Sequence, residues 1–257
     1  MIISDQQERH NWDRSWKKLP QFDEYPSLSW DLMDGDKEEH LLKRLGNKRG
    51  VLLEVGCGAA RLSARLSATG FTTVCLDSSK AAVELAKATY RDRGQTWRFG
   101  LTADAYHLPY SDGVFDGVLS TGLLEHFQDP APLIREMVRV AKPGGFVYAD
   151  VLPKKTWRLL LLFDFIRPLL GRYTDHLFEM PFRRNDIQQF AVEAGLKEVE
   201  VFPAGLYWPR WPILRGNRFF VGLENFASRL THPLFKKLDG TIWAEIFGIY
   251  YFMIGRK

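Results

Sequence analysis

Short apolar runs alternate with amphipathic stretches of helical length between residues 50 and 151. The apolar runs predict strands at 51–55, 71–76, 96–101, 114–120 and 145–151. The stretches predict helices at about 36–45, 59–69, 79–93 and 130–141. This alternation is typical of a parallel sheet that is covered by helices on both faces.

The rhythm changes after residue 151. A helix is predicted at 185–195, with Asn185 as its cap, and strands follow at 196–202 and 242–255. Segments 153–183 and 203–240 interrupt the pattern, so we expect insertions there, with irregular structure in the second.

The whole chain, 1–257, is therefore predicted to form a single α/β domain. We expect a Rossmann-like, seven-stranded, mostly parallel sheet with helices on both faces and an antiparallel last strand. The N-terminal segment 1–35 and the two insertions are predicted to form a lid on the substrate side.

Glycines and acids follow the predicted strands where each one ends. The first strand ends at Glu54-Val55 and runs into Gly56-Cys57-Gly58. Glycines let the backbone approach a ligand, and the N-terminus of the following helix offers N–H groups to an anion such as a carboxylate. Acids follow the next three strands, at Asp77, Asp104 and Glu125. Since ligands bind at the carboxyl ends of parallel strands, this pattern predicts a nucleotide cofactor.

Four segments, in order and at the expected spacing, then point to a family. They are "LLEVGCGAARLS", "VCLDSS", "TADAYHLPYSDGVFDGVLSTGLLEHFQDP" and "REMVRVAKPGGFVYADV". Across about 50–151 the chain resembles class I S-adenosylmethionine-dependent methyltransferases, particularly the small-molecule branch that includes quinone and sterol methyltransferases. The resemblance implies S-adenosyl-L-methionine as cofactor and 50–151 as the cofactor-binding core. Ala60 stands where many members have a third glycine.

The resemblance also assigns roles around the cofactor. It implies that Gly56, Cys57 and Gly58 line the methionine part through their backbone, with Glu54 supporting the loop. Asp77 would bind the ribose.

At the adenine, the resemblance places Ser78 beside the ring and Asp104 with Ala105 along its edge. Ser120 and Thr121 would face the sulfonium.

Catalytic residues are harder to predict than cofactor ligands. A sulfonium methyl is already electrophilic, so the main task is to hold the acceptor atom in line with it. A general base is needed only where the acceptor carries a proton of high pKa. His126, just after the fourth strand, is the first candidate base, and Tyr173 and His176 in the first insertion are two others.

Aromatic residues indicate the class of acceptor. Trp12 and Trp16 precede the first strand, where they could cover the cofactor, and Trp208 and Trp211 lie in the second insertion. They favour a small apolar, aromatic or lipid-like acceptor, with the methylated atom (O, N or C) left open.

The charge is uneven along the chain. Residues 151–257 hold 16 Lys and Arg against 10 Asp and Glu, a net of +6, whereas residues 1–150 hold 19 against 21, a net of −2. Basic residues beside apolar runs in 153–168 and 229–238 allow peripheral contact with a membrane, although core-facing helices would have the same pattern.

Other functions are left open or excluded. The basic C-terminal part leaves a tRNA or protein acceptor open, although nucleic acid is not favoured, and a non-catalytic cofactor-binding scaffold is a further alternative. An NAD-dependent oxidoreductase would need glycine where the chain has Arg61. The absence of a signal peptide and of a long apolar run predicts a cytoplasmic protein, with the oligomeric state open.

Overall fold

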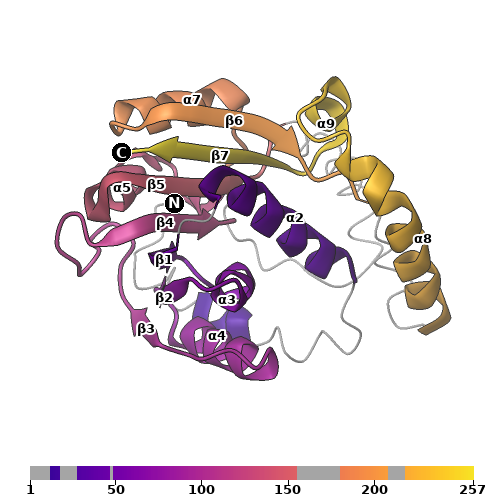
Figure 1. Cartoon of the computed structure of the whole chain (residues 1–257), viewed down its shortest axis with the longest axis horizontal. Coiled ribbons are helices and arrows are strands. Elements are labelled where there is room, and N and C mark those ends of the chain that lie inside the picture. The colour runs from indigo at the N-terminus through magenta and orange to yellow at the C-terminus, as the bar shows by residue number, and fades with distance from the viewer. Residues whose placement is uncertain (1–11, 18–27, 47–48, 155–179, 208–217) are drawn as a thin grey trace.

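The computed structural model describes residues 12–17, 28–46, 49–154, 180–207 and 218–257. They contain a seven-stranded sheet of order β3-β2-β1-β4-β5-β7-β6 (Figure 1). The strands are β1 (Val51–Val55), β2 (Thr72–Asp77), β3 (Phe99–Thr102), β4 (Phe115–Thr121), β5 (Ala141–Val151), β6 (Lys197–Ala204) and β7 (Tyr250–Arg256). The first five are parallel, and β7 runs antiparallel between β5 and β6. The predicted fold class is therefore confirmed.

Helices cover both faces of this sheet (Figure 1). The helices of the described ranges are α2 (Leu28–Leu45), α3 (Arg61–Ala68), α4 (Lys80–Asp92), α5 (Ala131–Val140), α7 (Arg184–Glu193), α8 (Arg218–Lys236), which packs on α2, and α9 (Ile242–Phe247), with a 3₁₀ turn η2 (Leu124–His126). Strand order reverses between β1 and β4, and the loops that follow these two strands flank the position where a ligand is expected.

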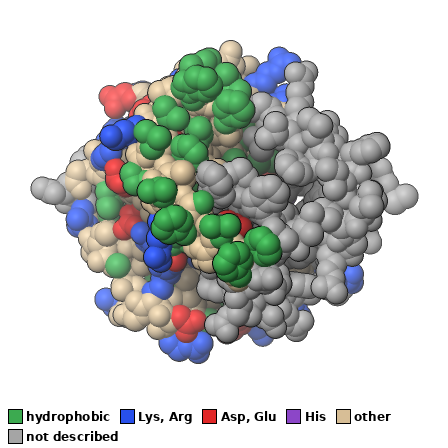
Figure 2. All heavy atoms as spheres, turned by 90° about the vertical axis from the view of Figure 1, so that its right-hand side faces the viewer, with side chains coloured by type: hydrophobic (Ala, Val, Ile, Leu, Met, Phe, Trp, Pro, Cys, Tyr) green, Lys and Arg blue, Asp and Glu red, His purple; other side chains and the backbone are tan. Residues whose placement is uncertain are grey.

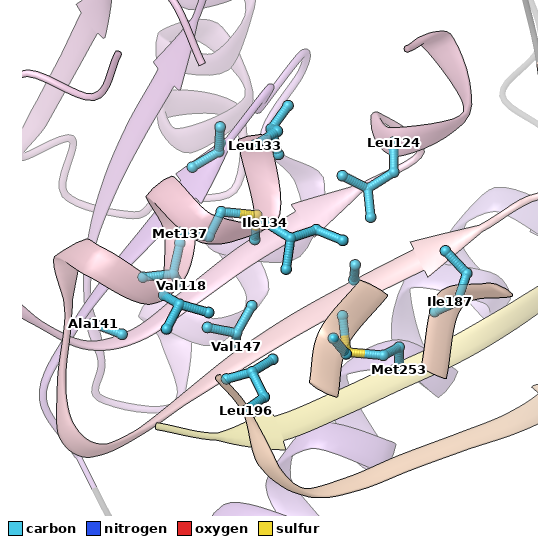
Figure 3. Packing of buried hydrophobic residues seen from close by; sticks show 14 of the residues in the cluster. Val118, Leu124, Leu133, Ile134, Met137, Ala141, Val147, Ile187, Leu196 and Met253 are labelled. Atoms are coloured by element: carbon cyan, nitrogen blue, oxygen red, sulfur yellow. The ribbon is translucent and has the colours of Figure 1, made fainter. Parts of the chain in front are cut away.

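Two buried layers hold the sheet to its helices. On one face, Val118 and Val147 of the sheet pack with Ile134 and Met137 of α5, and Ile187 of α7 joins them (Figure 3). On the other face, α2 and α3 cover a cluster that includes Leu41, Leu52, Leu62, Leu119 and Phe252. The sheet is thus buried on both sides, as parallel strands require.

Three expectations about secondary structure are wrong. Residues 242–255 are not one strand: the first part is helix α9, which ends at Phe247 and is capped by Gly248, and only Tyr250–Arg256 pair in the sheet. The segment 203–240 is not irregular, because it contains the 19-residue helix α8. Helix α2 starts at Leu28, well before the predicted position 36.

The predicted cap of the helix at 185–195 is also wrong. Asn185 lies inside α7, and Arg183 occupies the cap position. Asp186, the third residue of the helix, accepts a hydrogen bond of 2.9 Å from the Arg183 backbone N–H. The cap residue's N–H thus has a side-chain acceptor from within the helix.

Candidate functional site

A cavity of about 520 Å³ opens beyond the carboxyl ends of β1, β2, β4 and β5. It brings together most of the residues that the sequence singled out. Those lining it are Gly56, Cys57, Gly58, Asp77, Ser78, Asp104, Ala105, Thr121, Glu125 and His126. The cavity does not touch Glu54 or Ser120, and Tyr173 and His176 lie outside the described residues.

The loop after β1 requires glycine at two positions. Gly56 and Gly58 have φ of +65° and +49°, where other residues are strained. A Cβ on Gly56 would lie 2.6 Å from the Leu123 side chain, and one on Gly58 would lie 2.4 Å from the Trp16 ring. Ala60, at the position of the third family glycine, also has a positive φ of 51° and precedes the first turn of α3. At Gly56 and Gly58, glycine is therefore required both by the backbone conformation and because Leu123 and Trp16 occupy the space of a side chain.

Asp77 holds that loop in place from the end of β2. Its Oδ2 accepts a hydrogen bond of 2.9 Å from the Gly58 N–H, and its Oδ1 accepts one of 2.9 Å from the Ser79 N–H. Burial raises the pKa of the carboxyl, while these backbone donors oppose the rise. Each carboxylate oxygen has a further acceptor position, so the side chain can also accept from hydroxyl groups of a ligand in the cavity.

The part of the cavity beside the end of β3 is more open. Asp104 follows β3 and is half exposed, with Oδ1 accepting from the Tyr106 N–H at 2.9 Å and Oδ2 lying 3.2 Å from His107 Nδ1. One carboxylate oxygen thus orders the local turn. Ala105 and Ser78 line the same part of the cavity.

Glu54 and Ser120 lie within strands β1 and β4, where alternate side chains point to opposite faces of the sheet. Glu54 is buried beneath the cavity and accepts a hydrogen bond of 3.2 Å from the Thr121 hydroxyl. Burial raises the pKa of its carboxyl to about 7. Ser120 pairs in register with Ala149 on the opposite face of the sheet from Thr121, so it does not reach the cavity.

The N-terminal segment covers the cavity in the part that the structure describes. Trp16 packs against Gly58, and the Trp12 ring lies 4.7 Å from that of His126, edge to face. Asp13 ties this segment to the start of α4, because its Oδ1 accepts from the Ser79 hydroxyl at 2.9 Å and the Ala81 N–H at 3.0 Å. The ring of His126 therefore borders the cavity from beneath Trp12.

Removing the Asp13 carboxylate should release this cover. The pKa of Asp13 is lowered to about 2 by Lys17 and the Ala81 N–H, so the contact persists above pH 4 and weakens as the pH falls toward 2. We expect Asp13→Ala to cost about 1 kcal/mol in the free energy of unfolding, as for a lost helix cap. Acrylamide quenching of tryptophan fluorescence should increase, whereas Lys17→Ala, which removes only the solvent-side ion pair, should leave it unchanged. Equal quenching in Asp13→Ala and the parent chain would show that the segment is held by other contacts.

A second wall of the cavity contains charged residues that the sequence did not reveal. Lys37 of α2 donates a hydrogen bond of 3.0 Å to Asp150 Oδ1 at the end of β5, and both side chains are buried. The Tyr148 hydroxyl donates to Asp150 Oδ2 at 2.6 Å. Tyr250 lines the same wall, with the Lys37 ammonium 5.4 Å from its ring centre.

Arg61 belongs to this wall as well. Its Nε donates a hydrogen bond of 2.8 Å to Asp34, which is buried against the cavity. Asp150 could have been predicted to line the cavity, since it lies near the end of the fifth strand as Asp77 lies at the end of the second. Lys37 and Asp34 could not have been predicted from the sequence, because the face of α2 that lines the cavity depends on how that helix docks.

Comparisons with known proteins agree with this geometry. A family model described as "Methyltransferase domain" matches residues 53–149. The ubiquinone biosynthesis O-methyltransferase of Pseudomonas aeruginosa is 28% identical over 197 residues, covering 74% of this chain and 79% of that protein. The corresponding protein of Thiobacillus denitrificans is 29% identical over 153 residues, covering 58% and 66%. Methyltransferase GfsG of Streptomyces halstedii is 36% identical over 122 residues, covering 46% and 44%. The last two matches thus span less than two thirds of the relatives.

Solved structures share the fold. A methyltransferase from Thermotoga maritima superposes with a TM-score of 0.61 at 17% identity, covering 97% of this chain and 99% of the other. One from Methanosarcina mazei gives 0.56 at 18% identity, with 84% and 96% covered. Both proteins are described as S-adenosylmethionine-dependent methyltransferases.

Proposed function

Because the chain belongs to the class I S-adenosylmethionine-dependent methyltransferases, we propose that it methylates an oxygen atom of a small apolar or aromatic acceptor. The observation that carries this proposal is the mixed lining of the cavity. The glycine loop and the strand-end acids line it together with apolar side chains and the buried Lys37–Asp150 pair. The apolar residues are Met33, Leu123, Val151, Leu152 and Ile249.

The residues present fit the cofactor. Gly56 and Gly58 line the cavity with backbone in conformations that favour glycine, and the buried Asp77 carboxylate lines it beside them. The loop N–H groups and the start of α3 suit a carboxylate, and Asp77 suits a pair of hydroxyls. When bound, S-adenosylmethionine supplies an electrophilic methyl group.

Lys37 would act on the acceptor. An ammonium group beside a hydroxyl favours its ionised form, so an acceptor hydroxyl in the cavity becomes more nucleophilic. Asp150 fixes the Lys37 side chain, since their hydrogen bond is buried from water. His126 lines the same cavity and remains the candidate that would take the proton. The names of the ubiquinone biosynthesis relatives support an oxygen acceptor.

Methyl transfer from labelled S-adenosylmethionine tests the proposal. We expect transfer to hydroxylated aromatic molecules, with KM falling as an alkyl substituent lengthens. Label that stays on the cofactor despite tight binding would favour the non-catalytic alternative. Label on added tRNA or protein would favour a macromolecular acceptor.

Lys37→Met tests the oxygen acceptor. We expect kcat to fall about a hundredfold at neutral pH, in the range seen when one positioned electrostatic group is removed. Activity should recover partly at higher pH, where the acceptor ionises unaided, while Lys37→Arg keeps the charge and more of the activity. The double variant Lys37→Met/Asp150→Asn controls for the buried carboxylate left behind. An unchanged pH profile in Lys37→Met would contradict this role.

A further inference from the structure

Helix α8 turns its apolar side outward. Leu223, Phe226, Leu230 and Leu234 recur every three or four residues and are between 54% and 71% exposed. In a soluble protein, the apolar stripe of a surface helix normally faces the core. Here the orientation is reversed, so the core of this chain does not explain why these residues are apolar.

The inward side of α8 is polar instead. His232 Nε2 lies 2.9 Å from Asp36 Oδ2, and Lys236 Nζ lies 2.8 Å from Asp36 Oδ1. Asn225 Oδ1 accepts a hydrogen bond of 3.1 Å from the Leu28 N–H. These contacts fix α8 on α2 and thereby hold its apolar side toward solvent.

Helix α9 extends the same surface. Ile242, Trp243, Ile246 and Phe247 are between 52% and 66% exposed. The two helices lie on one side of the molecule, and Figure 2, which views that side, shows apolar side chains gathered there. We call these eight residues of α8 and α9 the apolar face.

The exposed charges beside the apolar face are basic. Among the side chains described in 218–249, the charged ones classed as exposed are Arg229 and Lys237. The three acids of this stretch are partly buried, and Asp239 is held by His40 and the Gly205 N–H. This arrangement complements an anionic surface. A two-fold contact between copies would bring the same basic residues toward each other.

The apolar face also leads to the cavity. Gly248 caps α9, and the next residue, Ile249, is 38% exposed and lines the cavity beside Tyr250. An apolar molecule held at this surface would therefore meet apolar side chains up to the cavity wall. This last point rests on the proposed function, whereas the surface contact does not.

We propose that the apolar face docks on an anionic lipid bilayer, with α8 lying in the plane of the headgroups. An amphipathic helix with a polar side and basic flanks binds membranes in this way. None of the helices in the described ranges has both the length and the apolarity to cross a membrane. The other candidate segment, 153–168, lies outside the described residues from 155 onward.

Co-sedimentation with vesicles tests the proposal. The probes are vesicles of phosphatidylcholine alone and of phosphatidylcholine with roughly one third phosphatidylglycerol. We expect the full chain to pellet with the anionic vesicles and Phe226→Asp/Leu230→Asp to bind them at least about tenfold more weakly. Arg229→Glu/Lys237→Glu should lose about fivefold per residue on the anionic vesicles and little on the neutral ones. Val192→Asp, which changes an exposed apolar residue on α7, is the matched control and should bind as the parent chain does.

Two results would overturn the proposal. One is a parent chain that stays in solution with both vesicles. The other is a parent chain that is dimeric by light scattering and becomes monomeric in Phe226→Asp/Leu230→Asp, because a second copy would then cover the face. Calorimetric titration with S-adenosylhomocysteine should be unchanged in all these variants. Failure of membrane binding is thereby distinguished from failure of the proposed methyl transfer.

Discussion

Asp77→Ala is expected to weaken the binding of S-adenosylhomocysteine at least about a hundredfold. Hydrogen bonds to a charged group contribute about 1.5–3 kcal/mol each, and the variant removes the acceptors proposed for a pair of ribose hydroxyls. It also leaves the Gly58 and Ser79 N–H groups without the acceptor that shapes the loop. Isothermal titration calorimetry measures the change directly.

Asp104→Ala is the matched control for this result. The Asp104 side chain is half exposed and one of its oxygens already orders the Tyr106 turn, so we expect a loss of about tenfold or less. A thermal melt of both variants confirms that they are folded. If Asp77→Ala binds within threefold of the parent chain, the carboxylate does not contact the cofactor.

Glu54 is expected to make the ligand-free protein less stable as the pH rises. The pKa of its carboxyl is raised to about 7 by burial, against about 4.5 when unfolded. Between these values the folded state binds more protons than the unfolded state, so the free energy of unfolding falls with increasing pH. The stabilisation present below pH 4.5 is lost by pH 7, and it amounts to about 3 kcal/mol at 1.36 kcal/mol per pH unit.

Comparison with Glu54→Gln isolates this contribution. The amide does not titrate, so the variant should lack the decline whatever its absolute stability. Urea unfolding at several values between pH 5 and 7.5 gives the two slopes. Parallel slopes for the two proteins would show that Glu54 is ionised throughout, contrary to its burial without a charged partner in hydrogen-bond contact.

Many of the residues expected to bind the cofactor could be predicted, because the direction of the parallel strands decides where they lie. Parallel strands end at the same edge of a sheet, so residues such as Asp77 and Asp104 meet although they are far apart in sequence. The positive φ values of Gly56 and Gly58 likewise match a tight turn into a helix. These features depend on the spacing of residues within short segments, which can be read directly from the sequence.

Ser120 and Thr121, which were both expected to face the sulfonium, differ in their access to the cavity. Adjacent residues of a strand face opposite sides of the sheet, so Ser120 and Thr121 have different surroundings. The register with β5 puts Thr121 beside Asp150 and Ser120 beside Ala149. Thr121 is the member of the pair that lines the cavity.

The remaining features depend on docking between distant segments. Lys37 reaches the cavity because of how α2 packs over one face of the sheet, which no local pattern indicates. Helix α8 contains Gly222 and Pro233 and presents its apolar side outward, so its sequence reads as an irregular stretch. In α9, β-branched and aromatic residues favoured a strand, but short apolar runs do not separate strand from helix.

A crystal structure of the chain with S-adenosylhomocysteine tests the central claim most directly. We expect the ribose hydroxyls within hydrogen-bond distance of the Asp77 carboxylate and the amino-acid end against the backbone of Gly56–Gly58. An adenosyl group bound away from these residues, at saturating ligand, would contradict the claim.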